Sequence, residues 1–252
     1  LSGAVTLNGA SPLIFATGAT HTLALPVALG ANATFNAASE LLSTGAISGA
    51  SSLTKTGAGR LVLAGPTTHT GVTTVSGGTL ALGNGGFEPN GIGQIVNNGA
   101  LEFNFNPAFG IGTGAISGTG SLTVLSGTLT SFFDLTYTGA TTVNAGGYAG
   151  ARFTNSGRLT IAAGGRVDTY DSTFGSLEGA GLLNINPGTV TVGGDGTSTT
   201  FSGTLAATGD FTKTGAGRLV LAGPTNHTGV TTVSGGTLAL GNGGFEPNGI
   251  GQ

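Results

Sequence analysis

The sequence predicts an all-β chain wound into a parallel β-helix, a solenoid with three short strands in each coil. Three observations predict it: an unusual composition, a long and nearly perfect internal repeat, and short alternating segments that stop at Gly, Pro or Asn. Glycine supplies 51 of the 252 residues, and only 7% are charged, against roughly 25% in ordinary soluble domains. The hydrophobic share of 38% separates the chain from disordered proteins, which combine low hydrophobicity with high charge.

Composition also argues against several classes of function. The net charge of -3 is the wrong sign for a nucleic-acid binder, which concentrates basic residues on one surface. No run of basic residues is available for an anionic membrane surface, and the most apolar stretch, residues 23–31, is too short to cross a bilayer. The absence of cysteine excludes disulfides and thiolate metal sites.

The repeat is the strongest evidence for a solenoid. Residues 212–252 repeat residues 54–94 with 40 identities in 41 positions, and residue 212 follows residue 54 by 158 positions. Weaker echoes of the same pattern join residues 47–61 to 116–130 and residues 69–80 to 137–148. A globular domain has no physical reason to carry such copies, whereas each solenoid unit buries its open end against the next. We therefore treat residues 1–252 as one continuous β-helix built on a 158-residue tandem unit.

The local pattern is strand, turn, strand, with no window of helical period. RLVLAG, VTTVSG and TLALGNG each alternate over a few residues and then meet a turn former. Alternation places Val62 and Thr74 on the outer surface. It assigns to the interior Leu61, Leu63, Thr73, Val75, Leu80 and Leu82. Such strands could also pair as antiparallel hairpins, but the long repeat favours a coil in which each strand pairs in parallel one turn later.

A family resemblance rests on these same residues. The strings LTKTGAGRLVLAG and HTGVTTVSGGTLAL resemble the passenger-associated transport repeat of bacterial autotransporters, also called the autotransporter-associated β-strand repeat. The pattern Leu-Thr-Lys-x-Gly-x-Gly-x-Leu-x-Leu-x-Gly, then Thr-Gly-x-Thr-x-Val-x-x-Gly-x-Leu, is met at 53–65 with 70–80 and again at 212–223 with 228–238. The chain departs from it in residues 1–46 and 131–173, and at Arg60 and Arg218, where small polar residues are usual.

The resemblance implies a right-handed β-helix that is exported to the cell surface or the extracellular space of a Gram-negative-type bacterium. It implies a passenger domain without a cofactor, and a signal peptide and outer-membrane anchor outside these residues. Because Gln252 is the equivalent of Gln94, we expect the natural array to continue past it with sequence close to IVNNGALEFN. Coils of roughly 20–25 residues, stacked about 4.8 Å apart, would separate equivalent residues of the two copies by roughly 30–40 Å.

Some β-helices cleave polysaccharides, so clustered acids are the first catalytic candidates. Asp168 and Asp171 form the best pair, with Arg158 and Arg166 near them in sequence. Glycoside hydrolysis needs two carboxylates on one groove, but positions three apart on a strand face opposite sides. We therefore interpret this pair as solvated loop charges and predict no enzyme.

The histidines lack the partners that metal sites need. His69 and His227 precede the two TTV strands, with no cysteine, second histidine or acid within a few residues. They are interpreted as turn or surface residues, and no metal is predicted. Lys55 and Lys213 are likewise interpreted as surface charges, with contact to a neighbouring rod as the alternative.

Two glycine-rich strings mimic ligand motifs. Residues 110–115, GIGTGA, resemble part of a dinucleotide fingerprint, which works only between a strand and a helix. Residues 193–196 and 83–86 resemble calcium-binding nonapeptide repeats but lack the tandem aspartates. Four asparagines in residues 97–106 are expected to form turn bonds or stacked ladders inside the coil. They are Asn97, Asn98, Asn104 and Asn106.

Three functional hypotheses follow. The first is a structural extracellular protein that forms a cell-surface or matrix rod or fibre, with self-association through tandem units favoured by the low charge. The second is an adhesin module that binds a host or glycan receptor through loops such as GNGGFEPNGIG, and the third is a glycan-active enzyme. The expected rod–rod or receptor contacts are Arg60, Arg218, His69, His227, Phe87, Glu88, Phe245 and Glu246.

Overall fold

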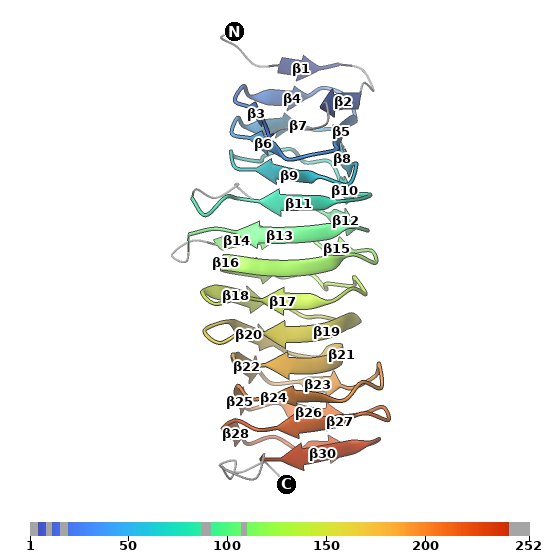
Figure 1. The fold of residues 1–252 in the computed structure, drawn as a ribbon, viewed down its shortest axis with the longest axis vertical. Helices are drawn as coiled ribbons and strands as arrows, with labels where there is room; N and C mark the ends of the chain where they lie inside the picture. Colours follow the sequence, from blue (N-terminus) through green and yellow to red (C-terminus); the bar gives the residue numbers. More distant parts are fainter. Residues whose placement is uncertain (1–4, 9–11, 16–19, 87–91, 107–109, 242–252) are drawn as a thin grey trace.

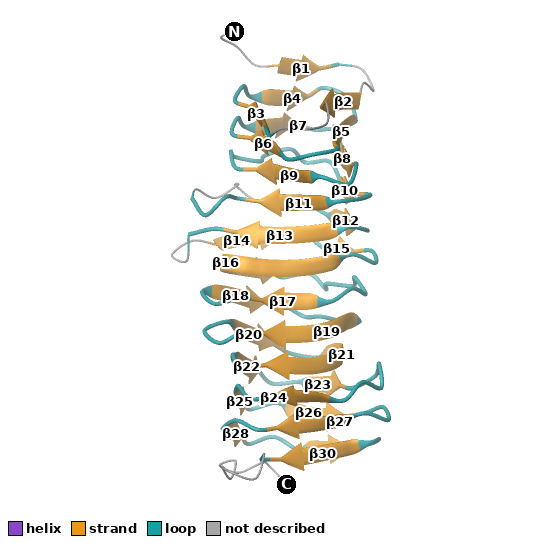
Figure 2. Cartoon of the chain, viewed as in Figure 1, coloured by secondary structure: helices purple, strands orange, loops and turns teal. Residues whose placement is uncertain are grey.

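The protein is a stack of parallel β-strands that extends along one long axis (Figure 1). The computed structural model describes residues 5–8, 12–15, 20–86, 92–106 and 110–241. It forms a solenoid of about 11 coils with about three strands in each, and the described residues contain no helix (Figure 2). The strand pairings are parallel, so the predicted coil is confirmed over the hairpin alternative.

Each coil visits three faces in turn, which we name face 1, face 2 and face 3. Face 1 is built from β2 (Pro12–Phe15), β5 (Ala33–Ala37), β8 (Leu53–Thr56), β10 (Thr73–Val75), β12 (Ile95–Asn97), β15 (Ile116–Ser117), β23 (Thr189–Val192), β26 (Asp210–Lys213) and β29 (Thr231–Val233). Face 2 is built from β3 (His21–Leu23), β6 (Leu41–Ser43), β9 (Arg60–Leu63), β11 (Thr79–Leu82), β13 (Ala100–Asn104), β17 (Thr141–Val143), β19 (Ser156–Ile161), β24 (Thr199–Phe201), β27 (Arg218–Leu221) and β30 (Thr237–Leu240).

Face 3 continues each coil back toward face 1. It is built from β1 (Val5–Leu7), β4 (Val27–Leu29), β7 (Ile47–Gly49), β14 (Gly110–Thr113), β18 (Gly147–Gly150), β20 (Arg166–Thr169), β22 (Leu182–Ile185), β25 (Thr204–Ala207) and β28 (Thr225–His227). Two long strands bend across a corner: β16 (Ser121–Ser131) joins faces 2 and 3, and β21 (Ser172–Gly179) joins faces 1 and 2.

The coils are slightly shorter than the sequence suggested. Paired residues lie between 16 positions apart, as in Arg166 with Leu182, and 22 apart, as in Thr73 with Ile95. The shortest coils fall in residues 141–185, where tight turns replace longer loops. One such turn places Gly164 at φ 81°, a conformation that glycine adopts without strain.

Alternation predicted the interior correctly. Leu61, Leu63, Thr73, Val75, Leu80 and Leu82 are all buried, and one apolar core cluster runs through the stack from Val27 to Leu221. Val62 departs from the prediction, because this outward residue is only 2% exposed. It lies in register between Leu42 and Ala81 of the adjacent coils, and such close neighbours on a flat sheet cover a branched side chain.

The loosely patterned region 131–173 continues the coil with larger core residues. Tyr137, Phe153 and Phe174 stack from coil to coil, with ring centroids 6.5 Å and 5.3 Å apart. The Tyr137 hydroxyl is hydrogen-bonded to that of Thr141, which in turn contacts the Ser156 hydroxyl at 2.7 Å. Aromatic stacking and a satisfied hydroxyl thus replace the Leu–Val columns of the repeats.

One corner position requires glycine because the coils approach too closely for a side chain. A Cβ atom on Gly59 would lie 2.0 Å from the Ser39 carbonyl oxygen, and one on Gly217 would lie 2.1 Å from that of Thr197. The Gly-x-Gly of the repeat therefore fixes the spacing of successive corners. Over the residues that the structure describes, no helix is long and apolar enough to cross a membrane.

Candidate binding surfaces

The described residues proposed from the sequence occupy two different settings. The lysines and histidines lie inside the coil, and the two arginines lie on the outer surface of face 2. The remaining four contacts, Phe87, Glu88, Phe245 and Glu246, fall outside the described residues.

Lys55 is buried, so its interpretation as a surface charge is wrong. Its side chain points into the coil from face 1 and is 0% exposed. The ammonium group donates to the carbonyl oxygens of Thr56, Gly57 and Gly77 at 2.7, 2.8 and 3.0 Å. A carboxylate is not among these partners, and burial lowers the pKa of Lys55 from 10.5 to about 8.

Lys213 reproduces this arrangement in the second copy and was also misassigned. Its ammonium donates at 2.6, 3.0 and 3.2 Å to the carbonyls of Thr214, Gly215 and Gly235. Burial lowers its pKa as well. The missed signal was the alternation itself, because Lys55 lies two residues after the inward-facing Leu53 on β8.

His69 and His227 are also buried, so neither the surface assignment nor the proposed contact role holds. His69 is hydrogen-bonded through Nε2 to the Thr73 hydroxyl at 2.8 Å, and burial lowers its pKa. His227 donates from Nε2 to the Gly209 carbonyl at 2.8 Å, and its Nδ1 lies 3.1 Å from the Thr231 hydroxyl. From the interior of the coil, each histidine at the end of face 3 is hydrogen-bonded to the threonine that begins the next strand of face 1.

Arg60 lies on the outer surface of face 2 between two acids. Its Nε and Nη2 atoms each lie 2.9 Å from one oxygen of Glu102, and Nη1 lies 3.5 Å from Glu40. Glu40 lies one coil before Arg60 and Glu102 lies two coils after it, so the three charges line up along the rod. Exposed pairs of this kind contribute little stability, typically about 0.2–1 kcal/mol.

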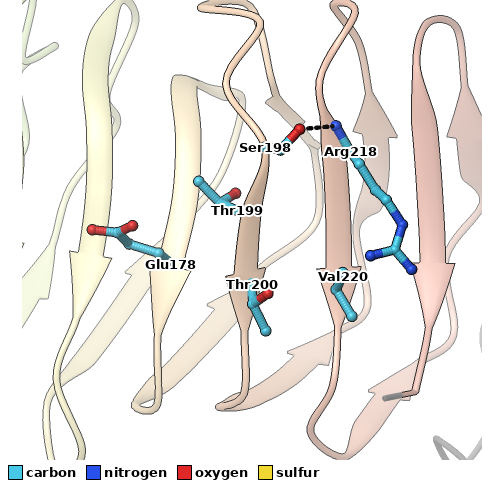
Figure 3. A pocket seen from close by; sticks show the side chains of 6 residues that line it. All are labelled: Glu178, Ser198, Thr199, Thr200, Arg218 and Val220. Atoms are coloured by element: carbon cyan, nitrogen blue, oxygen red, sulfur yellow. Dashed lines mark hydrogen bonds between the residues drawn. The ribbon is translucent and has the colours of Figure 1, made fainter. Parts of the chain in front are cut away.

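Arg218 occupies the equivalent place on β27 but lies in an open groove (Figure 3). The position equivalent to Glu40 is Ser198, whose hydroxyl accepts only the backbone N–H of Arg218, at 3.0 Å. Within the part of the chain that the structure describes, the guanidinium makes no ion pair. A cavity of about 420 Å³ is lined here by Glu178, Ser198, Thr199, Thr200, Arg218 and Val220.

The groove presents both signs of charge with hydroxyls between them. Glu178 and Arg218 lie on opposite sides of Thr199 and Thr200 (Figure 3). Arg158 lies 3.4 Å from the same Glu178 carboxylate. The groove was not predicted from sequence, because its walls come from residues 40 positions apart.

The two candidate catalytic acids serve different structural roles. Asp168 lies on β20, not in a loop as expected, and accepts from Arg166 at 2.7 and 2.6 Å. Asp171 occupies a turn at φ 41°, and its Oδ1 accepts the backbone N–H of Thr189 at 3.0 Å. Each carboxylate is therefore bound to a different partner set.

The glycine-rich strings also have structural explanations. Gly110–Thr113 is strand β14 rather than the start of a helix. Asp195 accepts from the Thr197 backbone at 2.9 Å and from the Ser176 hydroxyl at 2.7 Å. Burial alone would raise the pKa of Asp195, but these hydrogen bonds hold it below its usual range. No group of three or more potential metal-binding side chains occurs among the described residues.

The expected asparagine turn bonds are confirmed at two positions. Asn97 donates to the Ser121 carbonyl at 2.8 Å and accepts the N–H of Gly99 at 3.2 Å. Asn98 accepts the N–H of Thr119 at 3.2 Å. These side chains join one coil to the next at the corners.

Comparison with known proteins places the chain in a family. The passenger-associated-transport-repeat family matches residues 53–82 and 211–240. The chain is similar to the adhesin BmaC autotransporter of Brucella suis biovar 1 (strain 1330), with 38% identity over 283 aligned positions that cover 91% of this chain and 8% of that protein. No solved structure matches the chain. The chain belongs to the autotransporter passenger domains with passenger-associated transport repeats, and it lies at the cell surface or outside the cell of a Gram-negative bacterium.

Proposed function

We propose that this chain is a rod segment of a surface adhesin that presents binding surfaces away from the cell. The observation that carries the proposal is a stack of about 11 coils with grooves that open on the outer surfaces of the sheets. The similar Brucella protein is named an adhesin, and this chain spans 8% of its length. A sheet surface held at fixed register is a rigid support for side chains that contact a receptor.

The proposed role involves no catalysis. In the best acidic pair, Asp168 forms an ion pair with Arg166, and Asp171 accepts a hydrogen bond from the backbone of Thr189 in a turn. Arg158 contacts Glu178 instead of either aspartate. The arrangement supports recognition by an outer surface rather than bond cleavage in a catalytic groove.

Lateral association of rods into a fibre is a second proposal. The two repeat copies present nearly the same outward residues, with Thr68 replaced by Asn226, so most weak contacts made by one copy are available again at the other. With only 7% charged residues, two rods repel each other weakly.

Attachment of coated beads tests the adhesive role. Beads carrying the purified chain should bind cultured mammalian epithelial cells more than beads carrying an unrelated protein, and the free chain should compete. Attachment no greater than that of the control beads would rule the adhesive role out for this segment.

Sedimentation at increasing protein concentration tests the fibre. Self-association predicts a mass that rises with concentration and a particle that lengthens or thickens in averaged images. A constant monomer mass up to the solubility limit would reject the fibre and leave the adhesive role intact.

A further inference from the structure

Face 3 carries a second cavity, next to the most exposed aromatic side chains of the described residues. Phe132 is 95% exposed, Phe133 58% and Tyr170 40%. All three lie in the region 131–173, where the sequence departs from the repeat. Exposed aromatic rings lose the stabilisation that burial gives them, so their clustering marks an interaction site.

The cavity, of about 260 Å³, lies over β16, β18, β20 and β22, which are stacked in Figure 1. Its walls combine two aromatic types with hydrogen-bonding groups. The lining includes Thr130, Phe132, Tyr148, Asp168, Tyr170 and Asn186. The site is therefore neither a plain apolar patch nor a charged one.

Two side chains that line the cavity, Tyr148 and Asp168, are fixed by each other and by Arg166, which lies outside the lining. Arg166 donates two bonds to Asp168, and its guanidinium lies 5.6 Å from the centre of the Tyr148 ring. The Tyr148 hydroxyl donates to Asp168 at 3.2 Å. The carboxylate is 14% exposed and neutralised by its arginine, so the site has no net charge to attract an ion. Oδ2 accepts from both Arg166 and Tyr148, whereas Oδ1 accepts from Arg166 and keeps a lone pair with which to accept a ligand hydroxyl.

A glycine makes room for this arrangement. A Cβ atom on Gly150 would lie 2.7 Å from the Tyr148 hydroxyl oxygen. The tyrosine therefore lies across Gly150, the next residue on the same side of its own strand, where a side chain would displace it. This matches a pre-formed site, whose polar groups are held before the ligand arrives.

We propose that this cavity binds a neutral oligosaccharide. A sugar ring has an apolar C–H surface that packs on an aromatic ring, and hydroxyls at its edge that bond to carboxylate, amide and phenol groups. At about 260 Å³ the cavity is slightly smaller than typical ligand pockets, which span about 300–1,000 Å³, so it fits a short stretch of a glycan chain. A protein partner would need roughly 800 Å² of complementary surface on each side, and the exposed aromatic area here is three side chains.

The inference rests on the proposed adhesive function, because it names the receptor class and the residues that would recognise it. Within the site, Phe132 and Tyr170 supply apolar surface, while Asp168 and Asn186 supply polar contacts. Adhesion requires no catalytic groups, because binding alone retains the cell on a glycan-coated surface.

Phe132 and its neighbour Phe133 offer a matched pair of variants. Both are exposed, so neither Phe132→Ala nor Phe133→Ala should affect folding, and only Phe132 lines the cavity. The probes are immobilised neutral trisaccharides of glucose, galactose and N-acetylglucosamine, with sialylated trisaccharides for comparison. We expect the wild type to bind at least one neutral probe, Phe132→Ala to lose about tenfold in affinity, and Phe133→Ala to match the wild type.

A third variant, Gly150→Ala, should weaken the same binding by displacing Tyr148 without removing a contact group. The glycan site is overturned if no neutral probe binds, if only the sialylated probes bind, or if both phenylalanine variants behave alike. Bead attachment separates this failure from that of the proposed function. Cells that retain coated beads without any trisaccharide binding would keep the adhesive role and reject this site.

Discussion

The two copies of the transport repeat differ at two of 30 positions, Leu53 against Phe211 and Thr68 against Asn226, yet their surroundings differ more than their sequences. Lys55 and Lys213 make the same three bonds, because every acceptor belongs to the repeat itself. Arg60 pairs with Glu40 of the preceding coil, whereas the equivalent position beside Arg218 is Ser198. Contacts that stay within a repeat are set by its sequence, and contacts across its borders are set by the neighbouring coils.

The largest expected effect concerns the interior leucine of β11. Leu80 is 0% exposed and lies in register between Leu61 and Leu101 of the adjacent coils. Leu80→Asp places an unpaired charge in a stacked apolar column and should lower the free energy of unfolding by more than about 4 kcal/mol. Thr74→Asp, at an outward position of β10, should cost clearly less in the same denaturant titration, and equal losses would contradict the assignment of inward and outward positions.

Replacing the buried lysine should have an equal effect on stability in both copies. Lys55→Met and Lys213→Met each keep an apolar stem but leave three carbonyl groups without their donor. A buried group left unpaired costs about 1–3 kcal/mol, and relief of the desolvated charge offsets part of that loss. We expect the two variants to change the melting temperature by the same amount. A difference between them would mean that the three lysine–carbonyl hydrogen bonds depend on the adjacent coils.

The lowered pKa of Lys55 predicts a pH dependence that the Lys55→Met variant should lack. Between pH 8 and 10.5 the folded chain has lost this proton while the unfolded chain keeps it. The unfolded state then binds more protons, so stability rises with pH across this window. In urea titrations at pH 7, 8, 9 and 10, the free energy of unfolding of the wild type should rise relative to that of Lys55→Met above pH 8. A difference in free energy that stays constant with pH would contradict the lowered pKa.

The smallest effect concerns the two arginines. Ser198→Glu restores on the second copy the acid that Glu40 provides on the first, and should raise stability by about 0.2–1 kcal/mol at low salt. Combining it with Arg218→Ala should abolish the gain. An equal gain in both backgrounds would show that the new acid does not pair with Arg218.

The sequence predicted most of the fold and little of the surface. Alternation at Leu61, Leu63, Leu80 and Leu82 identified the core because a strand has only two sides. The assignments of Lys55 and His69 to the surface failed because residue type was allowed to outweigh position, since charged and ionisable residues are mostly exposed.

The outer grooves depend on a different kind of information. Glu178 and Arg218 lie on coils two turns apart, and the lengths of the intervening coils decide whether they share a groove. The exposure of Phe132 likewise follows a corner where the alternation of β16 ends. Such corners vary along the chain, so residue order alone does not place their side chains.

The equivalent register of the two copies has a consequence for the gene. Thr54 pairs with Thr34 and Thr74, and Thr212 pairs with Thr191 and Thr232, so both copies join their neighbours through the same strand of face 1. Recombination between the two nearly identical stretches would delete or add 158 residues while leaving each remaining coil with a neighbour on either side. We therefore expect the length of the rod to change in whole units, so that every shorter or longer product still covers its core.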